Sequence, residues 1–145
     1  FMIGLEAERA ATIRHGVRSP AAETRQNAMP RFGVDGLLKR NEIEDVAHYV
    51  LSLSGEKHDA AAAKRGEPVF AEQCVSCHGE KGVGNPELGA PRLSDGIWLY
   101  GGDFKSVVES ISNARAGMMP AWQDRLDEAT IKMLAIYVHG LGGGK

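Results

Sequence analysis

One pentapeptide, Cys74-Val75-Ser76-Cys77-His78, constrains this chain more than any other feature. A Cys-x-x-Cys-His run is the attachment signature of a c-type haem. The two thiols can form thioethers with the two vinyl groups on one edge of a porphyrin, and the histidine that follows is then held under the iron as its proximal ligand. The spacing therefore predicts one covalent haem c, attached through Cys74 and Cys77 and ligated by His78.

Two other uses of a Cys-x-x-Cys pair fit less well. A structural zinc site needs four ligands and usually a second Cys-x-x-Cys, whereas Cys74 and Cys77 are the only cysteines in the sequence. A thioredoxin-like pair expects a βαβ context, but the flanking residues look helical or rich in glycine. With both cysteines committed to haem, no disulfide can report the redox compartment.

Composition sets broad limits on function. The 145 residues can form one ordinary domain or two small ones. The formal net charge of -2 argues neither for nucleic acid nor for a strongly anionic surface, and no nucleic-acid partner is predicted. No apolar run approaches the roughly 18 residues that span a bilayer, and no signal peptide opens the chain. Because it starts in mid-pattern at Phe1-Met2, we expect the sequence to be a fragment of a longer one.

The hydrophobic pattern predicts a mostly α-helical chain with few strand signals. Helices are expected at residues 5–13, in a segment capped by Asn41 with Glu44 as its capping-box partner, at residues 62–73, and in two segments capped by Asp103 and Asp127.

The chain contains an internal repeat. At an offset of 88 residues, Ile43, Ala47 and Tyr49-Val50 match Ile131, Ala135 and Tyr137-Val138; at 90, Met29-Pro30 and Phe32 match Met119-Pro120 and Trp122; at 98, Thr12-Ile13 matches Ser110-Ile111. Two amphipathic helices always look somewhat alike, but a shared Met-Pro-x-aromatic loop makes coincidence a weak explanation.

The repeat predicts the domain organisation. Residues 1–55 are interpreted as a partial cytochrome c domain without its haem-attachment motif, 56–63 as a linker, and 64–145 as a complete cytochrome c domain with one covalent haem.

The second axial ligand of the iron decides the type of function. Met119 is preferred, because Pro120 stiffens the loop that carries it; Met118 is the alternative ligand, and both methionines could instead be core fillers. His15, His48, His58 and His139 are interpreted as solvated or structural. A His–Met pair closes both iron positions, raises the reduction potential and suits single-electron transfer.

Other residues are candidate haem contacts. The Pro91 carbonyl, 13 residues beyond His78, could accept the second imidazole N–H. Arg92 could pair with a propionate, and Trp98, Tyr100 and Trp122 could line the pocket or contact a propionate, although ordinary core or surface roles fit these four equally well.

Several of these stretches resemble a known family. Cys74 to Gly79, Ala90-Pro91-Arg92-Leu93, Ile97 to Gly102 and Met119-Pro120-Ala121-Trp122 are together similar to the second haem domain of the dihaem cytochrome c subunit (FixP/CcoP type) of cbb3-type cytochrome c oxidase. Residues 12–16 and 29–33 resemble the end of that subunit's first haem domain. The resemblance implies an all-α, class I cytochrome c fold.

The resemblance also implies a setting. In this family an N-terminal transmembrane helix anchors the subunit, and both haem domains lie on the periplasmic side of the bacterial inner membrane. They relay electrons from a donor cytochrome to the oxidase's catalytic subunit, so this subunit is not itself the site of oxygen reduction. Met29 would ligate the first haem, which would need residues upstream of Phe1. Membrane association would come only through that missing anchor or through the other oxidase subunits.

Two further functions remain open at this stage. A free soluble cytochrome c carrier would share the haem site but not the partial repeat. A haem-based sensor or peroxidase would need a displaceable methionine and would bind carbon monoxide.

Overall fold

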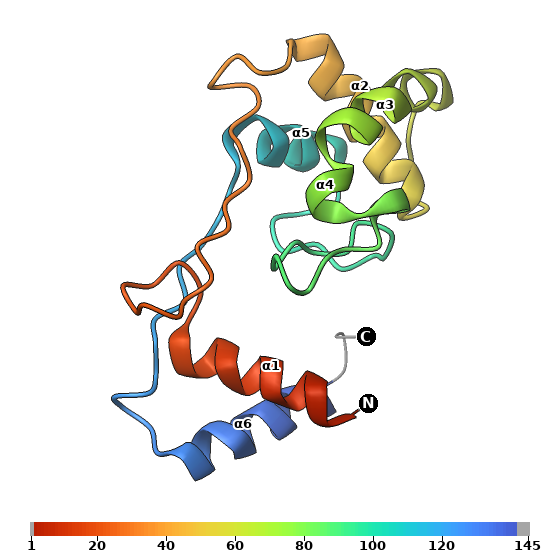
Figure 1. Cartoon of the computed structure of the whole chain (residues 1–145). Helices are drawn as coiled ribbons and strands as arrows, with labels where there is room; N and C mark the ends of the chain where they lie inside the picture. Colours follow the sequence, from red (N-terminus) through yellow and green to blue (C-terminus); the bar gives the residue numbers. More distant parts are fainter. Residues whose placement is uncertain (1, 142–145) are drawn as a thin grey trace. The chain divides into compact units, whose positions relative to one another are not determined.

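The computed structural model describes residues 2–141, with side chains from residue 7 onward, and consists of helices joined by loops, some of them long (Figure 1). Over this range the chain forms no strand, only isolated bridges such as Val17 with Met119. The prediction of a mostly α chain is therefore confirmed. The helices are α1 (Met2–His15), α2 (Arg40–Leu53), α3 (Ala60–Gln73), α4 (Val75–His78), the 3-10 turn η1 (Glu80–Gly82), α5 (Phe104–Asn113) and α6 (Glu128–Gly140).

These elements form two compact units. Residues 28–116, called here the motif unit, contain α2 to α5; residues 1–27 and 117–145, called the terminal unit, contain α1 and α6. The units do not follow the repeats, because α2 of the first repeat packs with α3 of the second. The division into 1–55, 56–63 and 64–145 concerns the repeats and stays a prediction.

The core of the motif unit forms where α2 meets α3 and α5. Gly66 lets the backbones of α2 and α3 approach closely, since a Cβ at this position would lie 2.1 Å from the Asp45 carbonyl oxygen. The apolar stripe of α2 supplies much of the buried surface. The buried core residues are Phe32, Ile43, Val46, Ala47, Val50, Leu51, Phe70, Val107 and Ile111.

Helix starts follow the sequence signals with one exception. Asp103 and Asp127 cap their helices as predicted, accepting bonds from the N–H groups of Ser106 (3.0 Å) and Thr130 (2.7 Å). Helix α3 is capped by Asp59 and begins inside the predicted linker 56–63.

The exception is the start of α2, where the predicted cap by Asn41 and Glu44 is wrong. The helix begins at Arg40, and Glu42 accepts a bond from the Lys39 N–H at 2.7 Å. Glu44 pairs instead with the Arg40 side chain one turn earlier, at 2.9 Å.

In the terminal unit, α1 and α6 lie side by side and run in opposite directions (Figure 1). Ala10, Ile131 and Ala135 form a small buried cluster. Arg14, in the last turn of α1, forms an ion pair with Glu128 in the first turn of α6. Much of α6 remains apolar and exposed, at Met133, Leu134, Ile136, Tyr137 and Val138.

Replacing Leu51 with Ala is expected to destabilise the motif unit by about 2–5 kcal/mol, because it leaves a cavity in a packed core. Leu51 is 1% exposed, whereas Leu141, just after α6, is 67% exposed and provides the matched Leu→Ala control. Urea unfolding followed by far-ultraviolet circular dichroism measures both, and the control should change stability by less than about 0.5 kcal/mol. Equal losses would contradict the packing described for α2.

Candidate haem-attachment site

The two cysteines lie on one short helical turn. Cys74 directly follows α3 and is the N-cap of α4, and its carbonyl accepts bonds from the N–H groups of Cys77 (3.2 Å) and His78 (2.9 Å). Residues three apart on a helix project from the same side. The local backbone therefore presents both thiols to one edge of a bound group, as thioether formation requires.

The His78 imidazole is oriented by a backbone carbonyl. Its Nδ1 lies 3.0 Å from the Pro91 oxygen, which is the contact expected from the 13-residue spacing. Because a carbonyl can only accept, Nδ1 carries the proton, and the Nε2 lone pair is left available for a metal.

Glycine shapes the loop that brings Pro91 to His78. Gly84 has φ +83°, and a Cβ there would lie 2.8 Å from the Arg92 backbone nitrogen. The Gly84 N–H donates to the His78 carbonyl at 2.7 Å, and Leu93 N–H donates to Gly82 O at 2.7 Å. These bonds hold the loop on both sides of Pro91, whose carbonyl accepts the hydrogen bond from the His78 imidazole.

The Cys74 thiol resists ionisation. Burial, and next the nearby Cys77, raise the pKa of Cys74 from its usual value of 9.0 to about 11. The Cys74 thiol therefore stays protonated to a higher pH than an ordinary cysteine.

Trp98 carries a buried donor with no partner. Among the described side chains, its indole Nε1 is one of the few buried polar atoms without a hydrogen bond. The ring lies against Gly102, where a Cβ would be 2.3 Å from it. A buried indole N–H normally finds an acceptor, and a haem propionate is an acceptor of the right kind.

Arg92 and Tyr100 already have partners. The Arg92 Nε donates to the Val83 carbonyl at 3.3 Å. The guanidinium of Arg115 lies 5.1 Å from the Tyr100 ring centroid and also donates to the Tyr100 carbonyl at 3.2 Å. Sequence reasoning did not single out Arg115, because a lone arginine after a helix carries no pattern.

The loops that follow the motif expose apolar side chains. A porphyrin is a largely apolar disc that would cover such a surface, which otherwise stays in contact with water. The exposed residues are Val83, Leu88, Ile97, Leu99 and Tyr100, followed by Phe104 at the start of α5. Together with two free thiols, an oriented imidazole and an unpaired indole N–H, they fit a covalent haem c.

The remaining predicted site residues, Met119 and Trp122, belong to the terminal unit. Met119 exchanges two backbone hydrogen bonds with Val17, at 3.0 and 2.9 Å. The Trp122 N–H donates to carbonyls at the end of α1, and its ring lies under Arg125, at 5.0 Å. The structure therefore does not place these two residues in the same unit as His78.

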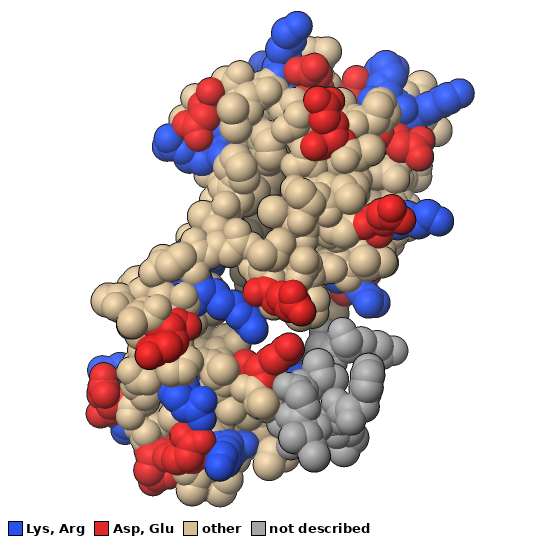
Figure 2. All heavy atoms as spheres, in the orientation of Figure 1, with Lys and Arg blue, Asp and Glu red and all other residues tan. Residues whose placement is uncertain are grey.

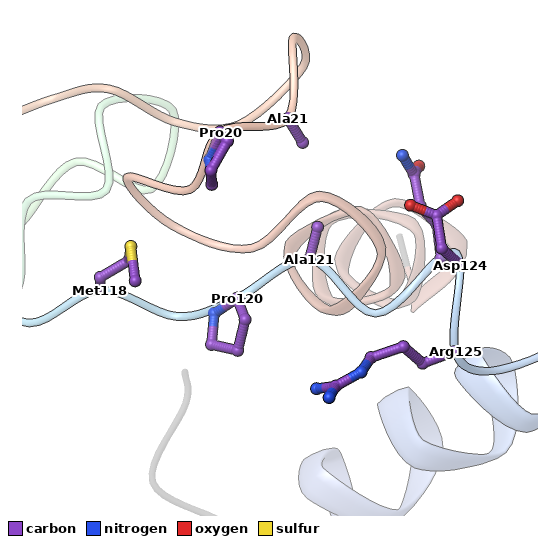
Figure 3. Close-up of a pocket in the computed structure, with 8 residues that line it drawn as sticks. Pro20, Ala21, Met118, Pro120, Ala121, Asp124 and Arg125 are labelled. Carbon is purple, nitrogen blue, oxygen red and sulfur yellow. The ribbon is translucent and has the colours of Figure 1, made fainter.

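Met118, the alternative ligand, lines an open depression of about 440 Å³ in the terminal unit. Figure 3 shows Met118, Pro120 and Ala121 along one segment, with Pro20 and Ala21 on the segment that faces it. The Met118 side chain is exposed.

Charges of both signs are interspersed over the face of the molecule in Figure 2, with broad uncharged areas between them. This pattern agrees with a formal net charge of only -2. On the face shown, the surface resembles that of an ordinary mixed-charge protein rather than a single electrostatic field.

In the haem-free chain, Cys74 is expected to alkylate slowly with iodoacetamide at pH 8. A pKa about two units above the usual value lowers the thiolate fraction ~100-fold, and the thiolate is the nucleophile. Because the pKa is raised, the deficit should shrink as pH rises towards 11. Mass spectrometry of the peptide that contains Cys74 isolates its reaction in the chain with both cysteines, and unfolding in urea provides its reference rate. Equal rates in the folded and unfolded chain would contradict the protection described here.

Comparison with known proteins supports the same assignment. The family model for cytochrome c oxidase, cbb3-type, subunit III matches residues 61–138. The cbb3-type cytochrome c oxidase subunit FixP of Bradyrhizobium sp. is 56% identical over 138 residues, covering 92% of this chain and 47% of the relative. The subunit CcoP of Cereibacter sphaeroides is 52% identical, and the match covers 92% of this chain and 47% of the relative. The subunit CcoP of Azospirillum brasilense is 51% identical, and the match covers 98% of this chain and 50% of the relative.

The chain thus spans about half the length of the curated relatives it matches. None of the helices within residues 2–141 has the length and hydrophobicity needed to cross a bilayer. The recognised family model covers the haem motif and reaches into α6. Given this match and the geometry around His78, the chain belongs to the CcoP/FixP family, the cytochrome c subunits of cbb3-type cytochrome c oxidase.

Proposed function

We propose that this chain transfers single electrons through one haem c bound covalently to Cys74 and Cys77. His78 supplies one axial ligand and a methionine thioether the other, for which the sequence favours Met119 over Met118. The single observation that carries the proposal is the His78 imidazole, held by the Pro91 carbonyl with Nε2 left for the iron. When bound, the haem supplies the reversible one-electron couple.

The chain's own residues hold the group and control its surroundings. The thioether cysteines fix one edge of the disc, and the Pro91 carbonyl keeps the imidazole in one tautomer and makes it a better donor. The unpaired Trp98 N–H is a donor for a propionate, and Arg92 would have to exchange its bond to Val83 for such a role. The exposed apolar side chains of residues 83–104 would exclude water from the porphyrin face.

The proposal also includes the domain organisation of the chain and its place in the oxidase. Residues 64–145 constitute a complete class I cytochrome c domain in terms of sequence repeats, preceded by the closing part of a second one in residues 1–55. In the whole subunit, the haem relays electrons from a donor cytochrome to the catalytic subunit of a cbb3-type oxidase, on the periplasmic side of the bacterial inner membrane. The chain is an electron-transfer component and does not itself reduce oxygen.

Purified full-length chain, matured with haem, is expected to carry one haem that acid–acetone extraction does not remove. Alanine at both Cys74 and Cys77 should give a chain without retained haem, because thioethers form only at thiols. The ferrous protein should not bind carbon monoxide, since a methionine fills the sixth position.

Absorption spectra of the ferrous protein, recorded before and after addition of carbon monoxide, test whether the sixth position of the iron is filled. Formation of a carbon monoxide complex at neutral pH would contradict the proposed electron relay and favour a sensor or peroxidase function. Extractable haem in the unmodified chain would contradict the attachment through Cys74 and Cys77.

A further inference from the structure

We propose that Arg115 is a positioning residue of the haem site. Its guanidinium ties residues 97–102 to α5 and so holds the Trp98 indole N–H in place for an acceptor on the bound haem. The inference deepens the proposed function and rests on it. All of these residues belong to the motif unit, which extends from residue 28 to residue 116.

The segment 97–102 has no helix or strand of its own to hold it. The side chains of Ile97 and Leu99 are 64% and 85% exposed. Burial therefore stabilises the segment mainly through Trp98, which packs against the core cluster of the motif unit. A segment with so few buried contacts opens readily unless polar contacts hold it.

The Trp98 ring is folded back over the end of this segment. A Cβ at Gly102 would lie 2.3 Å from the ring and 2.5 Å from its Nε1. Gly101 has φ +98°, and a Cβ there would lie 2.8 Å from the Ser106 hydroxyl in the first turn of α5. The direction of the indole N–H therefore depends on how residues 97–102 lie against α5.

Arg115 reaches the segment from the far end of α5. Ala114, at the end of the helix, has the left-handed φ of +52°. Arg115 then donates to the Ser106 carbonyl at 2.7 Å and to the Ser110 hydroxyl at 3.0 Å. It also donates to the Tyr100 carbonyl at 3.2 Å, and its guanidinium lies 5.1 Å from the Tyr100 ring centroid. One side chain thus joins two turns of α5 to the backbone and the ring of the segment.

These contacts occupy Arg115, so it is not the group that binds a haem acceptor. Its Nε donates to the Ser110 hydroxyl at 3.2 Å, its Nη1 lies 3.5 Å from the Glu109 carboxylate, and its Nη2 makes the bonds described above. Each of the three guanidinium nitrogens therefore has a partner. The Trp98 Nε1 has none and is the free donor. Arg115 acts on the haem site through the segment that it holds.

The first test follows Trp98 in the haem-free full chain. The sequence has two tryptophans, so Trp122→Phe leaves Trp98 as the single fluorophore of this kind. In that background, Arg115→Lys is expected to shift the emission maximum to longer wavelength and to increase quenching by iodide. The physical reason is that lysine lacks the planar fork that joins α5 to the segment.

Arg40→Lys is the matched control, because Arg40 is 92% exposed at the start of α2 and pairs with Glu44 one turn later. Both substitutions keep the positive charge, and far-ultraviolet circular dichroism verifies that the helices remain. An emission spectrum that Arg115→Lys leaves unchanged would overturn the proposal.

The second test measures the reduction potential of the full haem-loaded chain. Hydrogen bonds in the surroundings of a haem are one of the means by which a protein sets its potential. Loss of a donor to a propionate leaves more negative charge near the iron and favours the ferric state. We expect a lower potential in Arg115→Lys and no shift in Arg40→Lys. An unshifted potential in Arg115→Lys would show that the charge alone suffices, against a positioning role.

A double-mutant cycle tests whether Arg115 acts through Trp98. Trp98→Phe keeps an aromatic ring but removes the indole N–H. Arg115→Lys is expected to shift the potential when Trp98 is present and to have no further effect in the Trp98→Phe chain. Equal shifts in both backgrounds would show that Arg115 acts independently of Trp98 and would overturn the proposal. Because each shift is compared within one background, the cycle does not require the variants to be equally stable.

Failure of the proposed function has a different signature. An unmodified chain without covalently bound haem, or one whose ferrous form binds carbon monoxide, would defeat the electron-transfer proposal and this inference with it. The results that overturn the role of Arg115 alone leave both of those properties of the unmodified chain intact, so the two failures are distinguishable.

Discussion

The crossing of α2 and α3 at Gly66 is the contact on which the haem-bearing part of the chain depends. With no side chain at Gly66, the helix backbones meet directly, and any Cβ would collide with the Asp45 carbonyl. This approach brings Phe70 and Leu51 into one close-packed core. Because Cys74 follows the last residue of α3, the crossing also fixes where the attachment motif begins.

From that point outward, the site is built mainly by local backbone structure. The single turn of α4 aligns the two thiols, and a glycine-shaped loop returns Pro91 to His78. These features give the imidazole one tautomer and one orientation before any metal arrives. The remaining surface of the site is apolar and incomplete, with an indole N–H that lacks an acceptor. Such a surface is suited to a rigid cofactor rather than to a small polar substrate.

The repeat gives the chain two similar helices, α2 and α6, and specific contacts determine that α2 packs on α3 in the motif unit. Two helices of the same chain have nearly the same apolar pattern, so hydrophobic burial discriminates poorly between them. A bidentate Arg65–Asp45 pair and the contacts of His48 occur only with α2. Each is partly exposed and modest in energy, but together they distinguish partners that are otherwise alike.

Sequence alone determined the features that rest on short-range geometry. The Cys-x-x-Cys-His spacing, the Pro91 contact and the caps at Asp103 and Asp127 each involve a few neighbouring residues or one short loop, so residue type and spacing suffice to predict them. The cap of α2 was predicted wrongly, because Glu44 has two possible partners within one turn and pairs with Arg40. The grouping of α2 with α3, and of Met29 rather than Met119 with the motif unit, was decided only by the tertiary structure. The physical reason is that equivalent repeats carry equivalent patterns, and only long-range contacts such as Arg65–Asp45 distinguish one from the other.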